Sequence, residues 1–154
     1  MQSVEVKGID KLDSDLEDML KSAPEARREL HEKIAKRIKS EVNVQIDASG
    51  INDENGTIKR WQEERVGSGG GYAAISAVSG AVGDNSPGAI TNYLESGHKT
   101  RGPTGTAKRR RRGQAKKAYV DGFHFYQSAG GRAESIAIAA AETFADDLRK
   151  KLEG

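Results

Sequence analysis

The chain has no cysteine, only three prolines, and few aromatic residues, which make up 5% of its 154 positions. Without cysteine it has no disulfides, no thiolate metal sites and no thiol nucleophile. Large apolar residues are also scarce, because Leu, Ile, Val and Phe together number 28. No apolar run approaches the roughly 18 residues of a membrane span, and the N-terminus is acidic and patterned. The composition predicts a soluble, non-exported single domain over residues 1–154, with a small core that depends on partner subunits for stability.

The net charge of +2 conceals a strong segregation of charge along the chain. Residues 96–120 contain no acid, and the other 129 residues carry 16 basic and all 23 acidic side chains, a net −7. The nine cations of this acid-free stretch are Lys99, Arg101, Lys108, Arg109, Arg110, Arg111, Arg112, Lys116 and Lys117. Glycines and Pro103 interrupt the stretch, and no large aliphatic residue precedes Val120. The pattern predicts a mobile basic loop at about residues 99–118.

Apolar spacing predicts three amphipathic helices, over residues 10–21, 24–44 and 133–152. A capping-box pattern with a proline, Ser22-Ala23-Pro24-Glu25, separates the first two helices. The apolar positions are Ile9, Leu12, Leu16, Met19 and Leu20 in the first helix, Leu30, Ile34, Ile38 and Val42 in the second, and Ile136, Ala140, Phe144, Leu148 and Leu152 in the third.

Between these helices the sequence predicts strands and turns. Residues 57–66 and 72–79 form a predicted β-hairpin whose glycine-rich turn, residues 67–71, is expected to be flexible. A turn at residues 84–88 precedes a short element over residues 89–95, and Tyr119-Val120 is a short strand. The predicted fold class is α+β: two N-terminal helices and a long C-terminal helix packed on a small antiparallel β-sheet with long loops.

No residue pattern predicts catalysis, a metal or a cofactor. The histidines, His31, His98 and His124, are far apart and lack a metal-ligand spacing. Ser96 and His98 have no nucleophile-elbow motif around them. Residues 102–109 superficially resemble a phosphate-binding loop, but Arg109 follows Lys108 where that motif needs Ser or Thr.

The basic run over residues 108–117 is the strongest electrostatic feature of the chain. Its cations are Lys108, Arg109, Arg110, Arg111, Arg112, Lys116 and Lys117. They suit a polyanion, either nucleic acid phosphates or an acidic protein surface, although a merely solvated loop stays open as the simpler interpretation. No aromatic residue for base stacking lies inside the run, so binding that depends on nucleotide sequence is not expected.

Three blocks of the sequence carry a resemblance to a known family. They are Asn55-Gly56-Thr57-Ile58-Lys59-Arg60-Trp61, then Tyr93-Leu94-Glu95-Ser96-Gly97-His98-Lys99-Thr100-Arg101-Gly102, then Val120-Asp121-Gly122 leading to Phe125 and a long C-terminal helix. In this order they resemble the tail-completion, or head-to-tail joining, proteins of tailed bacteriophages. The most specific positions are Tyr93, Glu95, Gly97, His98, Thr100, Arg101 and Gly102.

The resemblance implies a non-enzymatic structural protein of the virion neck, made in the host cytoplasm. It implies a ring of identical subunits, commonly a hexamer, between a head-completion (stopper) protein and a tail tube or tail terminator protein, with packaged DNA as a further candidate partner. It implies no cofactor and no membrane.

Two other functions stay open at this point. One is a nucleic-acid-binding protein that uses residues 108–117 on the phosphate backbone. The other is a small hydrolase that uses Glu95 and His98.

Overall fold

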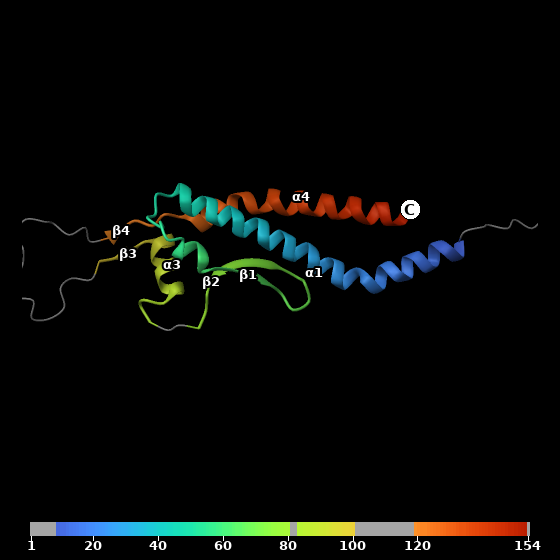
Figure 1. The fold of residues 1–154 in the computed structure, drawn as a ribbon, viewed down its shortest axis with the longest axis horizontal. Helices are drawn as coiled ribbons and strands as arrows, with labels where there is room; N and C mark the ends of the chain where they lie inside the picture. The colour runs from blue at the N-terminus through green and yellow to red at the C-terminus, as the bar shows by residue number, and fades with distance from the viewer. Residues whose placement is uncertain (1–8, 81–82, 101–118, 154) are drawn as a thin grey trace, which may run out of the picture. The chain divides into compact units, whose positions relative to one another are not determined.

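The computed structural model describes residues 9–80, 83–100 and 119–153, which form four helices and four short strands within those ranges (Figure 1). These residues divide into two compact units. Unit 1 comprises the chain as far as Lys39, the segment Glu64–Ile75, and the chain from Arg132 onward. Unit 2 comprises Ser40–Glu63 and Ser76–Gly131. Both long helices contribute residues to both units, and the single domain stays a prediction.

Helix α1 (Ile9–Ala48) is one continuous helix of 40 residues, so the prediction of two N-terminal helices is wrong. Pro24 lies inside it, where proline removes one backbone hydrogen bond and disturbs the preceding turn. The Ser22 hydroxyl bonds back to the Met19 carbonyl (3.2 Å), and residues 20–25 are exposed, so water can solvate the freed carbonyl. Figure 1 shows a change of direction in the blue part of α1, as expected at a proline. The helix therefore bends instead of ending.

Unit 1 contains the turn of the hairpin formed by β1 (Gln62–Val66) and β2 (Ala73–Ala77). The Gly67 amide donates to the Tyr72 carbonyl (3.0 Å), and the Gly70 amide donates to the Gly67 carbonyl (2.8 Å). Gly70 is buried with φ +62°, and a Cβ there would lie 3.0 Å from Arg28 Cα in α1. The glycines expected to make this turn flexible therefore let it approach the α1 backbone.

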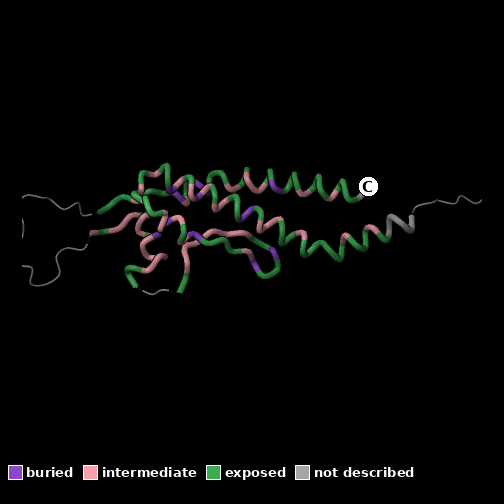
Figure 2. The backbone as a smooth tube through the Cα atoms, in the orientation of Figure 1, coloured by how far each residue is buried: buried purple, intermediate pink, exposed green. Residues whose placement is uncertain are grey.

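The core of unit 1 is thin. Its buried apolar residues within the described ranges are Ile34, Ala35 and Ala140. Leu30, Ile38, Ile136, Phe144 and Leu148, from the predicted apolar rows, are half-buried. Figure 2 shows the N-terminal part of α1 mostly in green, so this end of the helix is exposed on nearly every side.

Unit 2 has the larger core, built from Val42, Ile46, Ile58, Phe125 and Ala129. Its short elements are α2 (Thr57–Arg60), α3 (Pro87–Ser96), β3 (His98–Lys99) and β4 (Tyr119–Val120). Strands β3 and β4 pair antiparallel, with His98 opposite Val120 and Lys99 opposite Tyr119. Helix α4 (Phe125–Glu153) begins in this unit.

The α+β fold class is confirmed, with several differences in detail. The strands form two separate two-stranded sheets instead of one. Residues 57–60 are helical where a strand is predicted, and α4 starts at Phe125 rather than at residue 133. The short element before Gly97 and the strand at Tyr119-Val120 are confirmed.

Candidate interface at the base of the basic segment

The candidate interface is built on the end of α3. Ser86 caps the start of this helix by accepting a hydrogen bond from the Ala89 amide (3.2 Å), and Pro87 occupies the first turn. At the other end the Gly97 amide donates to the Tyr93 carbonyl (2.9 Å), and Gly97 has φ +76°. A positive φ is readily adopted only by glycine, so Gly97 ends α3 and turns the chain into β3.

The segment after β4 docks backbone to backbone on this helix end. The Phe123 amide donates to the Leu94 carbonyl (2.7 Å), and the His124 amide donates to the Glu95 carbonyl (3.1 Å). A Cβ on Gly122 would lie 2.6 Å from the Gly97 nitrogen and nearer still to the Glu95 carbonyl oxygen. We call residues 93–98 and 119–127 the motif junction, because two of the three resemblance blocks meet there.

Glu95 caps helix α4 from a position some 30 residues earlier in the chain. Its Oε2 accepts from the Tyr126 amide (2.8 Å), and its Oε1 accepts from the Gln127 amide (3.0 Å). These amides belong to the first turn of α4, where backbone donors have no partner within the helix. The carboxylate also lies at the positive end of the helix dipole. Glu95 thereby fixes where α4 begins.

Tyr126 and Gln62 continue this network into α2. The Tyr126 hydroxyl donates to Gln62 Oε1, and Gln62 Nε2 donates to the Ile58 carbonyl (2.8 Å). Gln62 is fully buried, so these bonds satisfy a side chain that would otherwise be costly to bury. Burial, together with the nearby Glu95 charge, raises the pKa of Tyr126 from 10.0 to about 12.

Tyr93, His98 and Tyr119 also make contacts at the motif junction. Tyr93 and His98 make a ring contact with centroids 5.2 Å apart, and the Tyr119 hydroxyl donates to the Ser96 carbonyl (2.6 Å). His98 Nδ1 is buried without a hydrogen-bond partner in the described part of the chain. Both Glu95 oxygens accept backbone amides, and no hydrogen bond between Glu95 and His98 is found among the described residues. These contacts make Glu95 a helix cap and His98 a packing residue.

The predicted contact residues themselves fall outside this description. Lys108, Arg109, Arg110, Arg111, Arg112, Lys116 and Lys117 lie outside the described residues, as do Arg101 and Gly102. The structure does describe the residues that flank the basic segment, as we call residues 101–118. Lys99 pairs with Tyr119 across the β3–β4 ladder, and Tyr119, Val120 and Phe123 expose 43%, 39% and 40% of their surface there. Exposed aromatic and apolar side chains therefore follow the basic run directly on its C-terminal side.

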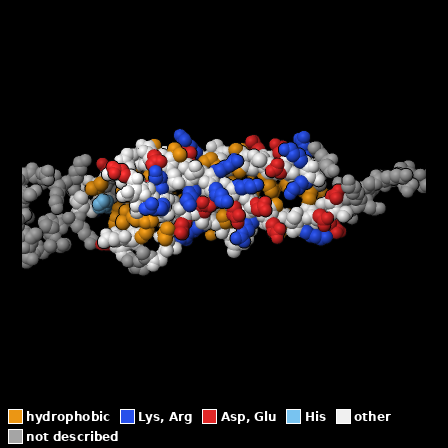
Figure 3. All heavy atoms as spheres, viewed as in Figure 1, with side chains coloured by type: hydrophobic (Ala, Val, Ile, Leu, Met, Phe, Trp, Pro, Cys, Tyr) orange, Lys and Arg blue, Asp and Glu red, His pale blue; other side chains and the backbone are white. Residues whose placement is uncertain are grey.

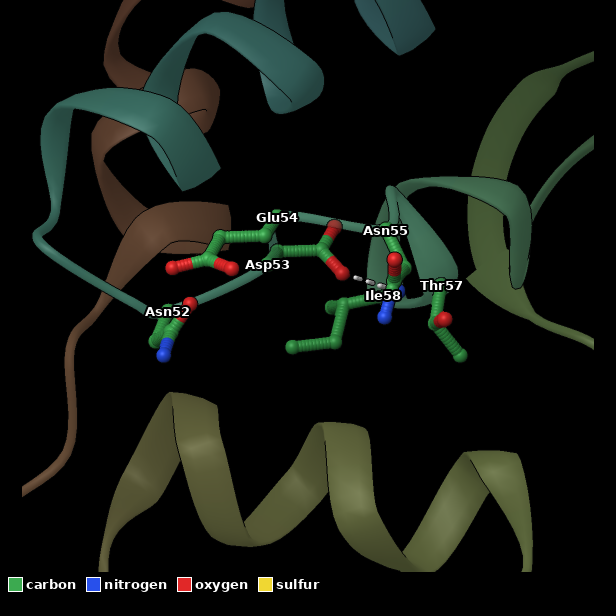
Figure 4. Close-up of a pocket in the computed structure, with 6 residues that line it drawn as sticks. All are labelled: Asn52, Asp53, Glu54, Asn55, Thr57 and Ile58. Carbon is green, nitrogen blue, oxygen red and sulfur yellow. Dashed lines mark hydrogen bonds between the residues drawn. The ribbon is translucent and has the colours of Figure 1, made fainter.

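A polar depression of about 270 Å³ lies in unit 2 over the loop before α2. Figure 4 shows its lining residues, Asn52, Asp53, Glu54, Asn55, Thr57 and Ile58. The Asp53 carboxylate accepts from the Ile58 amide (3.0 Å) and the Lys59 amide (3.1 Å), so it too caps a helix. Lys59 Nζ contacts Asp47 at 2.7 Å, and this hydrogen bond raises the pKa of Lys59. These contacts stabilise the local turn.

The capping roles of Glu95 and Asp53 are not predicted from the sequence. Each carboxylate caps a helix that does not contain it, and capping patterns in sequence are recognised over three or four residues. For Glu95, the sequence features that could have indicated a capping role are its place in the family-like block and the aromatic stretch near the start of α4.

Within the described ranges, no group of three or more His, Asp or Glu side chains is placed to hold a metal ion. No described helix is long and apolar enough to cross a membrane. A scan against models of protein families, a search of curated proteins and a search of solved structures each found no match to this chain.

Proposed function

We propose that this chain is a non-enzymatic virion protein that forms a ring, a hexamer, at the head–tail interface of a tailed bacteriophage. In this role it joins a head-completion or stopper ring to a tail tube or tail terminator. It is assembled in the host cytoplasm, resides in the neck of the virion, and needs no cofactor.

The main support is that the described residues of the first two resemblance blocks, and the third block as far as Phe125, lie in unit 2 and are linked by hydrogen bonds. Glu95 of the second block caps α4 beside Tyr126, just after the third block. Tyr126 bonds to Gln62, which bonds to Ile58 of the first block. Blocks far apart in sequence thus form one local framework, as expected if they define a single structural module.

Charge and exposed surface give further support. The β3–β4 ladder pairs the residues on either side of a segment that carries seven cations within ten residues, and exposed apolar side chains follow that segment on its C-terminal side. A ring built from identical subunits needs two different complementary surfaces on each subunit. A chain with an acidic majority and one basic segment can supply them.

Nucleic-acid binding is the second candidate function. It is favoured by the density of cations over residues 108–117, which would gain affinity for phosphate by releasing counterions. The hydrolase interpretation has less support, because the Glu95 carboxylate is occupied by two backbone amides.

Oligomeric state and DNA affinity, measured on the full chain, separate these functions. We expect closed ring particles in electron micrographs, either of the chain alone or with its neck partners, and little affinity for duplex DNA at about 0.15 M salt. A monomer that binds DNA, with a log-log salt slope of about −0.9 for each phosphate contacted, would favour the second function. Substrate turnover that is lost in His98→Ala would favour the hydrolase.

A further inference from the structure

Helix α1 carries an apolar stripe whose two halves differ in burial. In the C-terminal half, Ile34, Val42 and Ile46 are buried. In the N-terminal half, Leu16 and Leu20, one helical turn apart, expose 44% and 74% of their surface. Solvent-exposed leucines at this spacing on a helix are typical of a face that another chain covers.

The same helix is divided by charge along its axis. Residues 14–20, which we call the acidic arm, hold Asp15, Glu17 and Asp18. Lys21, the next residue, lies 3.6 Å from Glu17 Oε2 and 3.6 Å from Asp18 Oδ1, so the arm with this lysine keeps a net negative charge. Residues 27–39, which we call the basic stretch, hold six cations and two acids. The cations are Arg27, Arg28, Lys33, Lys36, Arg37 and Lys39.

Lys21 offsets one charge of the acidic arm, and the net negative charge that is left lies too far from the basic stretch for the two to neutralise each other within one copy. Their centres are about 16 residues apart, or roughly 24 Å along a helix that rises 1.5 Å per residue. The screening length at physiological salt is only about 8 Å. Attraction to the helix dipole does not account for the position of these acids either. That effect is confined to the first turn, and α1 begins at Ile9, so Asp15 already lies beyond it.

The side of unit 1 that carries the basic stretch also offers an apolar anchor. Tyr72, in the hairpin turn, is 60% exposed, and a Cβ on the adjacent Gly71 would lie 3.6 Å from Arg27 Nη2. Arg27, Lys33 and Arg37 are exposed as well. Figure 3 shows Lys and Arg side chains grouped over the middle of α1 on the drawn face. An exposed tyrosine next to the glycine that faces Arg27 suits a partner that presents both leucine and carboxylate.

We propose that the acidic arm of one copy of this chain docks on the basic stretch and Tyr72 of a second copy. The occupant follows from complementarity, because each copy holds both the arm and the surface that fits it. Since these are different surfaces, the contact can repeat head to tail. It would then be a subunit contact of the ring, and in that respect it rests on the proposed function.

Charge reversal on the full chain tests the contact. The wild-type chain is expected to associate weakly, in a concentration-dependent way, in sedimentation velocity at about 0.05 M salt, and less at about 0.5 M. An arm variant, Asp15→Lys with Glu17→Lys and Asp18→Lys, should raise the dissociation constant about tenfold or more. A receiver variant, Arg27→Glu with Lys33→Glu and Arg37→Glu, should do the same. A 1:1 mixture of the two variants should associate again, because the lysine arm of the first fits the glutamate surface of the second, and the native acidic arm of the second fits the native basic surface of the first.

Two further variants complete the test, one as a control and one as a probe of the apolar contact. Glu134→Lys with Glu142→Lys and Asp146→Lys reverses three exposed acids on α4 and should leave association unchanged. Leu16→Gln with Leu20→Gln removes the apolar part of the arm, retains helix propensity, and should weaken association while the circular dichroism spectrum stays the same.

The contact is overturned if the wild type does not associate, if the arm variant associates as well as the wild type does, or if the mixture of variants fails to recover. If the full chain forms dimers through this contact and nothing larger, the result would support the contact and contradict the proposed ring. Rings that form normally from the arm variant would contradict the contact alone.

Discussion

At the scale of single residues, Gly122 occupies a position where no side chain fits. Its Cβ would meet the Gly97 nitrogen at 2.6 Å and the backbone of residues 95 and 96, atoms that cannot move without breaking the motif junction. We predict that Gly122→Ala lowers the free energy of unfolding by about 2–3 kcal/mol, because a methyl group is forced into packed backbone. Urea denaturation would measure the change.

The control for this prediction is Gly130→Ala in α4. A Cβ at Gly130 meets no atom within 4 Å, and the residue is helical, so this variant should be stabilised by about 0.5–1 kcal/mol. Equal effects of the two substitutions would show that the junction is not as tightly packed as the contacts indicate.

Tyr126 gives the protein a pH dependence in the alkaline range. Its pKa rises from 10.0 to about 12 in the folded state, because burial and the Glu95 charge disfavour the phenolate. Between these two pH values the unfolded chain loses the proton while the folded chain keeps it, so the free energy of unfolding falls as pH rises. This contribution to stability is fully present below pH 10 and lost towards pH 12.

The measurement is the urea midpoint against pH for Tyr126→Phe and for the control Tyr72→Phe, whose ring is exposed. The Tyr72 variant should follow the wild-type profile. The Tyr126 variant should start from a lower stability, since it loses the bond to Gln62, and should decline less steeply above pH 10. Parallel profiles would show that Tyr126 titrates normally.

At the scale of secondary structure, the start of α4 depends on a carboxylate from α3. Glu95→Ala leaves the Tyr126 and Gln127 amides without their acceptors, so we predict a loss of about 1–2 kcal/mol of stability and faster hydrogen exchange at these amides. Glu95→Gln should fall between the wild type and the alanine variant, because it keeps one acceptor oxygen. The control, Glu54→Ala, removes an exposed carboxylate in the same unit and should change neither measurement.

The elements differ in how far the sequence predicts them. The buried and half-buried rows of α1 and α4 follow from apolar spacing, which is a local signal. For α3 the sequence predicts a turn at residues 84–88 and a short element over residues 89–95, whereas the structure begins the helix at Pro87 with Ser86 as its cap. The early start of α4 does not follow, because Gly130-Gly131 suggests a break while the stabilising carboxylate is distant in sequence. The sequence does not predict that α1 continues through Pro24. The same local sequence, Ser22-Ala23-Pro24-Glu25, is compatible with a proline in the first turn of a new helix and with a proline at an exposed bend inside one helix.

The same reasoning applies to the candidate site. Its residue types are predicted, since the family-like block supplies Glu95, Gly97 and His98 in one junction. Their roles are not predicted, because capping and packing depend on what the fold brings beside them. The contact role of the cations in residues 108–117 stays a prediction.

At the scale of the whole molecule, the part of the chain that the structure describes exposes as many large apolar side chains as it buries apolar ones. Among the described residues, the exposed large apolar side chains are Leu16, Leu20, Val44, Tyr72, Tyr119, Val120, Phe123 and Ile138. Several of them lie near charge: the leucines among the acids of α1, Tyr72 next to the glycine that faces Arg27, and Tyr119 opposite Lys99. Apolar surface bordered by charge suits interfaces that form during assembly between folded subunits.

The basic run supplies the last prediction, which rests on the proposed joining of heads to tails. Seven cations within ten residues repel one another unless phosphate or an acidic surface is near. Replacing Arg109, Arg110, Arg111 and Arg112 by serine removes no apolar residue from the sequence, so we expect the thermal midpoint of the purified chain to stay within about 2 °C of wild type. The number of joined particles, or the retention of packaged DNA, should fall when this variant replaces the wild-type chain during phage assembly. Lys150→Ser with Lys151→Ser, which removes two exposed cations from the end of α4, should leave joining intact. Wild-type joining and infectivity in the four-arginine variant would show that the run is only a solvated loop.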